Sequence, residues 1–186
     1  MSSGEVVRQL DVSNDPLFDL LRRAAGSGGE TWVVGGYVRD RLLGRDAHPD
    51  VDVVVVDASA RDLAERVAVL AGAPPPAVFE RFGTAQVTWD ERRLEFVAAR
   101  RESYRPESRK PDVEPATLDE DLQRRDFTVN ALVCDLSGAV HDPLGGLPDL
   151  ERRVLRTPLD PRATFRDDPL RMLRAARFAA QLGFRL

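Results

Sequence analysis

The order of apolar and polar positions along the chain predicts helices mixed with short strands. A helix is predicted over residues 14–26, where Asn14-Asp15-Pro16 is a typical helix start and apolar residues follow at helical spacing. A second helix is predicted over Arg61–Ala71, before Gly72 and three prolines. Turn residues then divide a β-rich stretch, which predicts strands over residues 78–82, 84–89 and 93–98.

The second half of the chain has its own pattern of polar and apolar residues, which predicts a loop, helices and a hairpin. Residues 100–118 are polar and aperiodic and contain prolines, which predicts a flexible loop. Helices are predicted over 118–123 and 127–134, with a hairpin near 137–141. The stretch 164–182 is strongly amphipathic, and its apolar side requires a surface to cover it. The residues on that side are Leu170, Leu173, Ala176, Phe178 and Leu182. We therefore expect one domain over residues 1–145 and the beginning of a truncated helical domain over 146–186.

The most informative pattern joins a glycine pair to an acidic strand. A short buried strand ends at Gly35-Gly36, a helix is expected over 37–43, and the next strand begins Asp50-Val51-Asp52 and continues with four valines. Residues i and i+2 of a strand lie on one face about 6.5–7 Å apart, so the two aspartates point the same way. Two carboxylates at the start of an apolar strand are costly without a cation between them. A hard divalent ion, typically Mg²⁺, suits these oxygen ligands.

The glycines meet a second requirement of nucleotide chemistry, which is a place for the phosphates. Because glycine has no Cβ, phosphate oxygens can approach the backbone amides at the start of the following helix. Together, metal ligands and a phosphate-binding turn indicate phosphoryl or nucleotidyl transfer. Glu95 lies between apolar residues on a strand that we expect in the same sheet, where it would polarise or deprotonate the attacking hydroxyl beside the metals. The alternative is an outward-facing glutamate on a half-exposed strand.

A second polar cluster surrounds Arg125, Asp126 and Asn130. Asp126 is a suitable N-cap for a following helix, and this structural role is one interpretation. The other is that the three side chains hold a ribose hydroxyl and triphosphate oxygens. The residues alone leave both interpretations open.

A third cluster contains Asp168 and Arg171, which share a face because they are three residues apart in a predicted helix. One interpretation is a surface ion pair at a proline-containing helix start. In the other, the carboxylate accepts a hydrogen bond from the exocyclic amine of cytosine or adenine, while the guanidinium donates to the adjacent ring acceptor. Uracil and guanine place a carbonyl opposite the carboxylate, so the pair would reject them without a nucleic-acid template.

Composition limits the class of protein. The chain has 186 residues and a net charge of −4, which argues against a surface coated in basic residues for nucleic acid. No apolar run approaches the ~20 residues that span a bilayer, and the start of the chain lacks signal-peptide features. The single cysteine, Cys134, excludes an internal disulfide framework and is expected to be a buried hydrophobe. We expect a cytoplasmic protein without a membrane partner.

Four motifs, in their order and spacing, resemble class II tRNA nucleotidyltransferases, which are the bacterial and eukaryotic CCA-adding enzymes, and the related bacterial poly(A) polymerases. The similarity covers roughly residues 25–186. The motifs are Gly35-Gly36-Tyr37-Val38-Arg39-Asp40, Asp50-Val51-Asp52, the stretch 124–132 and the stretch 167–178. The chain departs from the family at one place: it has Asp167-Asp168 where the family often has Glu-Asp.

The resemblance implies an α+β fold: a polymerase-β-like head with a mixed sheet flanked by helices, followed by the start of an all-helical neck. It implies Mg²⁺ as cofactor, CTP and ATP as substrates, and the tRNA 3′ end as primer. The site residues that it implies are Asp50 and Asp52 for the metal, Glu95 as third catalytic carboxylate, Gly35, Gly36 and Arg39 for phosphate, Arg125, Asp126 and Asn130 for ribose and phosphate, and Asp168 and Arg171 for the base.

The resemblance leaves three activities to distinguish. The loop 101–118 corresponds to one associated in the family with A addition, which favours CCA addition or A addition alone. A poly(A) polymerase is the alternative with the same chemistry. A nucleotide-binding fragment that is inactive without C-terminal tRNA-binding domains is the alternative from another class.

Overall fold

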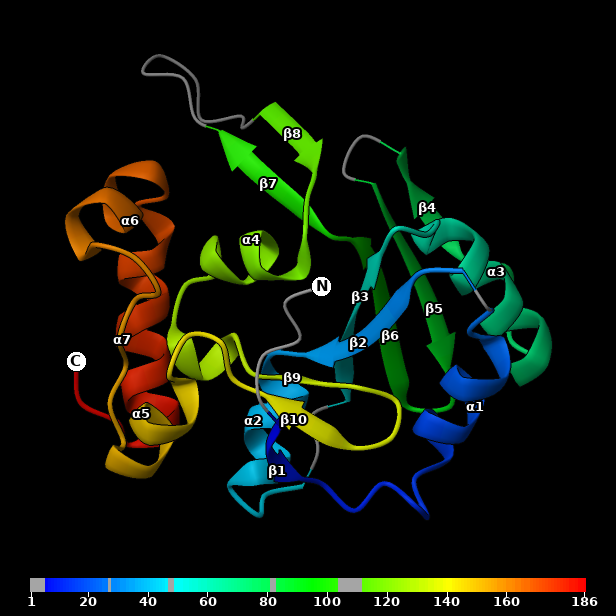
Figure 1. Ribbon diagram of the computed structural model, residues 1–186, viewed down its shortest axis with the longest axis horizontal. Helices are drawn as coiled ribbons and strands as arrows, with labels where there is room; N and C mark the ends of the chain where they lie inside the picture. The colour runs from blue at the N-terminus through cyan, green and yellow to red at the C-terminus, as the bar shows by residue number, and fades with distance from the viewer. Residues whose placement is uncertain (1–5, 27, 47–48, 81–82, 104–111) are drawn as a thin grey trace.

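The computed structural model describes residues 6–26, 28–46, 49–80, 83–103 and 112–186 (Figure 1). These residues form an eight-stranded sheet in the order β1-β10-β9-β2-β3-β6-β5-β4. The central strands β3 and β6 are parallel and the other neighbours are antiparallel, so the predicted mixed sheet is confirmed. In sheet order the strands are β1 (Val6–Gln9), β10 (Ala139–His141), β9 (Val133–Cys134), β2 (Glu30–Val34), β3 (Asp50–Val56), β6 (Arg92–Ala98), β5 (Thr84–Trp89) and β4 (Ala77–Phe79).

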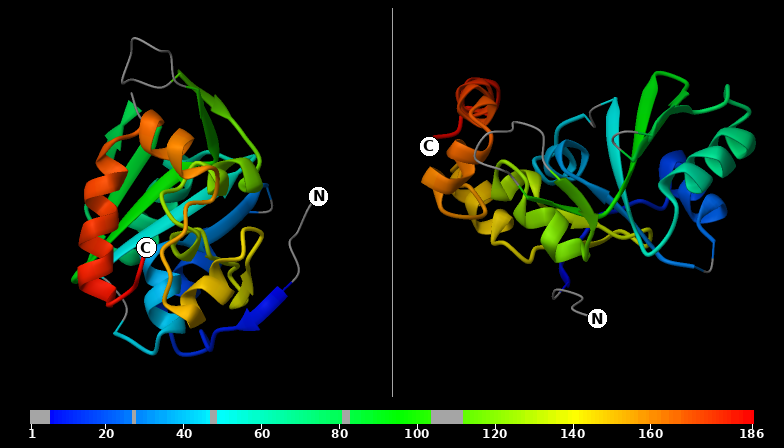
Figure 2. Two further views of the ribbon diagram at one scale, coloured as in Figure 1. Left: turned by 90° about the vertical axis from the view of Figure 1, so that its left-hand side faces the viewer. Right: turned by 90° about the horizontal axis from the view of Figure 1, so that it is seen from above.

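Helices α1 (Pro16–Ala24) and α3 (Ala60–Ala71) cover one face of this sheet (Figures 1 and 2). Their apolar residues share a core with Val51, Val53 and Val55, the alternate residues of β3. The predicted helix boundaries are close to the observed ones, because local chemistry sets them. The Asp15 side chain caps α1, and α3 ends at Gly72, whose φ of +62° is a typical glycine C-cap.

The opposite face carries the polar residues of β3 and most of the remaining helices. Here α4 (Leu118–Gln123), α5 (Gly146–Arg152), α6 (Pro161–Asp167) and α7 (Leu170–Leu182) lie away from α1 and α3 (Figures 1 and 2). Helix α2 (Gly36–Leu42) instead contacts α1, because Tyr37 donates to Asp15 and its ring lies near that of Phe18. Val54 and Val56 contribute to a smaller core on this face. In the part of the chain that the structure describes, each helix is too short or too polar to cross a bilayer.

The segment 100–118, predicted to be a loop without regular structure, contains two strands in its described part, and its flexibility stays a prediction. β7 (Arg100–Ser103) and β8 (Asp112–Pro115) pair as an antiparallel ribbon, and α4 begins at Leu118. Residues 104–111, within the same predicted loop, lie outside the described residues. The ribbon lacks apolar alternation because its cross-strand contact is an ion pair, with Arg101 Nε 2.9 Å from a carboxylate oxygen of Glu114.

Two helix predictions are corrected. The stretch 127–134 contains a 3₁₀ turn, η2 (Thr128–Asn130), followed by β9, because Val133 and Cys134 are buried between β2 and β10. The predicted helix 164–182 is divided into α6 and α7 at Asp168-Pro169, as expected where proline supplies no N–H.

The buried side of α7 also differs from the prediction. It consists of Ala175, Phe178 and Leu182, whereas Leu170, Leu173 and Ala176 are exposed. At about 100° per residue, Leu170, Leu173 and Ala176 lie on the opposite side of α7 from the three buried residues, so the five predicted positions never formed one face. These three buried residues belong to the same core cluster as the sheet residues, and the division at residue 145 stays a prediction.

Candidate active site

A cavity of about 820 Å³ lies between the polar face of the sheet and α7. Its walls come from β3, β5 and β6 on one side and from α2, η2 and α7 on the other. The structure therefore brings the four motifs, which are up to 136 residues apart, to one place. All eleven predicted site residues line this cavity: Gly35, Gly36, Arg39, Asp50, Asp52, Glu95, Arg125, Asp126, Asn130, Asp168 and Arg171.

The acidic wall is formed by the parallel strands β3 and β6. Asp50 and Asp52 lie on one face, as their spacing predicted, and Glu95 is the register partner of Asp52. Arg93 is the register partner of Asp50 and donates to its carboxylate from Nε at 2.8 Å. Partial burial, and next the charge of Asp52, raise the pKa of the Glu95 carboxyl. Glu95 is thus a better proton acceptor than an ordinary glutamate.

The donor set at this wall fits a magnesium ion only together with substrate. Among the described residues there is no group of three or more metal-ligating side chains close enough to hold an ion by themselves. Mg²⁺ is commonly bound by one or two carboxylates plus substrate phosphates. Asp50 and Asp52 supply these two carboxylates, so the residues present suit an ion that is completed by a triphosphate.

The glycine turn faces the same wall. Gly35 has φ +78° and ψ −135°, a backbone conformation available almost only to glycine. A Cβ built on Gly35 would lie 3.3 Å from Oδ2 of Asp52 and 3.5 Å from Nη1 of Arg125. The backbone of the turn is therefore open on the side where the carboxylates and a guanidinium converge.

A chain of polar groups, buried except at Arg174, connects the glycine turn to α7. Arg39 is 3% exposed and donates to Asp40 at 2.8 and 2.9 Å and to Oδ1 of Asn130 at 2.6 Å. The Asn130 amide donates to Oδ1 of Asp126 at 3.0 Å, and Arg174 donates to Oδ2 of Asp126 at 2.8 Å. Asp126 thus joins η2 to α7, in addition to accepting from its neighbour's amide. Its position fits both interpretations of this cluster.

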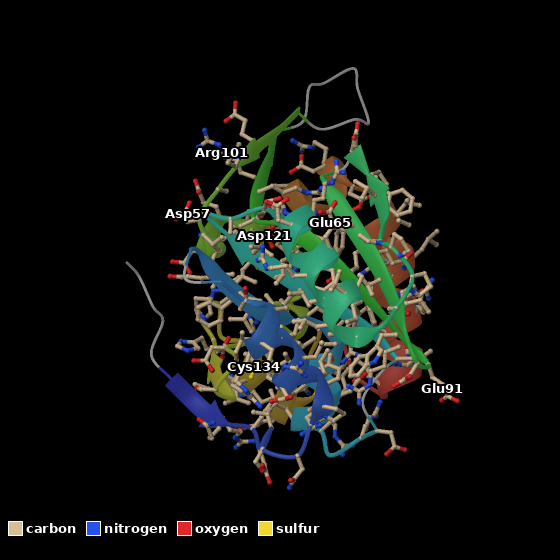
Figure 3. All side chains as sticks on the ribbon, turned by 90° about the vertical axis from the view of Figure 1, so that its right-hand side faces the viewer. Asp57, Glu65, Glu91, Arg101, Asp121 and Cys134 are labelled. Carbon is tan, nitrogen blue, oxygen red and sulfur yellow. The ribbon has the colours of Figure 1, made fainter. Side chains whose placement is uncertain are left out.

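A second buried carboxylate, Asp121, was missed by the sequence reasoning. It is fully buried, at the position labelled in Figure 3, and lies 2.6 Å from Nη2 of Arg124 and 3.4 Å from Nη2 of Arg125, two arginines that line the cavity. It also accepts from the backbone amide of Arg100 at 3.2 Å. Within the described residues the buried Nε of Arg125 has no hydrogen-bond partner. A buried donor without a partner at the cavity wall suits a ligand that accepts hydrogen bonds.

The pair predicted to read the base flanks the start of α7, with Asp168 just before the helix and Arg171 in its first turn. Nε of Arg171 is 3.7 Å from Oδ2 of Asp168, so the ion pair forms. It is not a free surface pair, because the Arg171 side chain is only 11% exposed and donates to the carbonyl of Arg124 at 2.5 Å. Asp168 accepts from the amide of Leu170 at 3.0 Å with its other oxygen. Both side chains line the cavity, as the base-reading interpretation requires.

Other lining residues were also missed, and some had a sequence signal. Arg174, Arg177 and Gln181 follow Arg171 at three, six and ten residues along α7, so helical periodicity alone places them on nearby faces. Gln86 is the register partner of Glu95, which depends on strand pairing and is not visible in the sequence. The further lining residues are Val54, Thr84, Arg93, Val97, Arg100, Arg124 and Phe178.

The chain is similar to nucleotidyltransferases in sequence and in structure. It is 45% identical to an A-adding tRNA nucleotidyltransferase of Aquifex aeolicus, over 83% of this chain and 19% of that protein. It is 42% identical to a CC-adding tRNA nucleotidyltransferase of Deinococcus radiodurans, over 96% of this chain and 48% of that protein. The chain thus spans less than half the length of these relatives.

A solved tRNA nucleotidyltransferase, complexed with a primer tRNA and an incoming ATP analogue, superimposes on the chain with a TM-score of 0.75. The two are 40% identical, and the match covers 90% of this chain and 46% of that one. The likeness confirms the predicted α+β, polymerase-β-like head fold. The family model for the poly A polymerase head domain matches residues 31–156, which include the glycine turn, the acidic strands and the ribose cluster. The chain therefore belongs to the poly A polymerase head-domain family, the family of the class II tRNA nucleotidyltransferases.

Proposed function

We propose that this chain carries the catalytic head of an enzyme that adds nucleotides from CTP and ATP to the 3′ end of tRNA, completing CCA or adding its A, without a nucleic-acid template. The observation that supports it best is the convergence of all four motifs on one cavity. The cavity contains groups suited to each part of one nucleotide. Two carboxylates and a glycine turn suit the phosphates, a polar cluster suits the sugar, and an Asp–Arg pair suits the base. The similar proteins are named A-adding and CC-adding tRNA nucleotidyltransferases, which supports nucleotide addition to tRNA and leaves the added nucleotides to the test below.

Each group has a role in the proposed reaction. Asp50 and Asp52 would hold Mg²⁺, which supplies positive charge to the triphosphate when bound. Glu95 accepts the proton of the tRNA 3′ hydroxyl, a role that its raised pKa favours. The 3′ oxygen forms a bond to the α-phosphorus, the bond from that phosphorus to the bridging oxygen breaks, and pyrophosphate leaves. Gly35, Gly36 and Arg39 would position the phosphates.

The remaining residues select the nucleotide. Arg125, Asp126 and Asn130 would bind the ribose and the phosphates nearest to it, and the buried donor of Arg125 requires such an acceptor. Asp168 accepts from the amine of cytosine or adenine, and Arg171 donates to the ring acceptor beside it. An ion pair fixed against the backbone of Arg124 suits this task, because a fixed pair keeps its hydrogen-bonding pattern.

The test is incorporation of labelled CTP or ATP with Mg²⁺ and three tRNAs that lack CCA, CA or the final A. Addition of CC and then A supports CCA addition, and addition of A alone supports the A-adding form. Long A tails identify a poly(A) polymerase, and nucleotide binding without transfer identifies a binding fragment. Asp52→Asn should abolish transfer, and transfer at the wild-type rate would overturn the metal assignment. Asp19→Asn, an exposed position on α1, is the matched control.

The proposed activity also suggests organisation and location. We propose that residues 1–145 are the head and that residues 146–186 begin the neck, since α7 carries the base-reading pair while the head carries the chemistry. CTP, ATP and tRNA meet in the cytoplasm, which is the proposed location.

A further inference from the structure

Asp15 is a buried carboxylate whose two oxygens accept four hydrogen bonds from the described residues. One oxygen accepts from the amide of Leu17 at 3.0 Å and from Nη1 of Arg92 at 3.1 Å. The other accepts from Nη1 of Arg41 at 3.0 Å and from the hydroxyl of Tyr37. The Asp15 side chain is 5% exposed, and neither Asp15 nor Tyr37 is among the described residues that line the cavity. The carboxylate therefore joins α1 to α2 and to β6 from outside the cavity.

Helix α2 depends on contacts of this kind for its position. It has seven residues, and its N-cap, Gly35, makes no side-chain hydrogen bond to the helix amides. Helices shorter than about 12 residues are marginal by themselves in water. Tyr37 and Arg41 are four residues apart and share a face of α2, whereas Arg39 lies on the opposite face. Helix α2 is therefore held from two sides, by the polar contacts of Arg39 at the cavity and by Asp15 on the face away from it.

The glycine turn shares the position of α2, because Gly36 is the first residue of that helix. Tyr37 comes next in the chain and is 1% exposed, and its hydroxyl donates to Asp15. The same carboxylate accepts from Arg92, the first residue of β6, and this strand carries Glu95 three residues later. Asp15 thus ties the glycine turn and a strand of the acidic wall to one point.

We propose that Asp15 is a positioning residue, which through the Tyr37 hydroxyl keeps the glycine turn in the place where it receives the triphosphate. This rests on the proposed function. A nucleotide binds only to those molecules whose turn is in place, so its apparent affinity falls in proportion to their fraction. A hydrogen bond to a charged group changes an equilibrium by roughly tenfold or more. Asp15 therefore acts on CTP affinity without touching the nucleotide.

The test is calorimetric binding of CTP with Mg²⁺ to the 186-residue chain, at a temperature where circular dichroism shows that every variant is folded. Tyr37→Phe removes only the hydroxyl, and we expect CTP affinity to fall about tenfold. Asp15→Ser keeps an N-cap for α1 but is too short by one bond to hold the hydroxyl, so it should weaken CTP at least as much. In the Asp15→Ser background, Tyr37→Phe should have no further effect, because the contact is already lost.

The matched control is Ser59→Ala, which removes the N-cap of α3, where the Ser59 hydroxyl accepts from the amide of Asp62 at 3.1 Å. It should lower the unfolding midpoint and leave CTP affinity unchanged. A second measurement reports on the turn itself. Asp15 is distant from Gly35 and Gly36 in the sequence, so their amide resonances in a ¹H–¹⁵N spectrum should shift in Asp15→Ser only if the turn moves. They should stay at their wild-type positions in Ser59→Ala.

The other outcomes separate the two proposals. Unchanged CTP affinity in Tyr37→Phe, or unshifted glycine resonances in Asp15→Ser, makes the contact a structural one only, which overturns the positioning role and leaves the proposed function standing. A further loss of affinity from Tyr37→Phe in the Asp15→Ser background also overturns it, because the two residues then do not act as a unit. Tyr37→Phe keeps the buried ring, so it decides the test by itself if Asp15→Ser does not fold. A wild-type chain that does not bind CTP contradicts the proposed function and the positioning role together.

Discussion

Asp121 offers the sharpest test of how the cavity is held in shape. Its carboxylate is fully buried and is shared by Arg124 at 2.6 Å and Arg125 at 3.4 Å. Asp121→Ala would remove the buried carboxylate that both guanidiniums share, and breaking a buried pair in this way costs about 3–5 kcal/mol. The variant also removes the acceptor for the amide of Arg100. For a domain whose unfolding free energy is typically about 5–15 kcal/mol, this is a large loss.

Urea unfolding followed by circular dichroism measures the effect as a lower midpoint with an unchanged slope. Asp121→Asn keeps the shape and one acceptor, so it should be less destabilising than the alanine variant. Asp19→Asn removes an exposed carboxylate 3.9 Å from Arg23 and should change the unfolding free energy by less than about 1 kcal/mol. A loss below about 1 kcal/mol in Asp121→Ala would refute the claim that this carboxylate organises the arginines.

Three further outcomes follow from the geometry. Burial raises the pKa of Asp15, but hydrogen bonds, the strongest from the Tyr37 hydroxyl, lower it overall. The stabilisation from the Asp15 carboxylate is therefore fully present above the ordinary pKa of aspartate and is lost as the pH falls through the lower pKa of the folded state. Below about pH 4, the free energy of unfolding of Asp15→Asn should therefore fall less steeply with decreasing pH than that of wild type. Gly35→Ala should lose about 1–3 kcal/mol of unfolding free energy and should also lose CTP binding, measured by calorimetry. Gly44 has φ +67° and open space around it, so Gly44→Ala should lose stability but bind CTP normally. Arg171→Glu should increase misincorporation of U and G more than it slows metal-dependent transfer, and unchanged selectivity in single-turnover assays would refute base reading.

The sequence predicted those features that depend on local periodicity or on strand parity. Asp50 and Asp52 share a face because successive strand residues alternate, and α1 begins at its proline because Asp15 caps it. Features that depend on distant partners were missed. The residues next to Cys134 in the sequence favour a helix, but pairing with β2 and β10 makes Cys134 a strand residue. Asp121 resembles any acidic residue of a first helical turn, and only the packing of α4 against the cavity reveals its two guanidinium partners.

The paired charges bear on how a chain with a net charge of −4 would hold the polyanionic substrate that we propose. Most of the cavity arginines are already matched to aspartates, so the cavity is not a general attractor of polyanions. Its donors are fixed by contacts such as Asp126 with Arg174 at 2.7 Å and Arg39 with Asn130 at 2.6 Å. Fixed donors stabilise developing charge without reorganising during the reaction. The chain of polar contacts from Asp40 to Arg174 also crosses from α2 to α7, so it fixes the spacing between the glycine turn and the Asp168–Arg171 pair. In the proposed function, a nucleotide is recognised by the fit of its length and hydrogen-bonding pattern to this spacing.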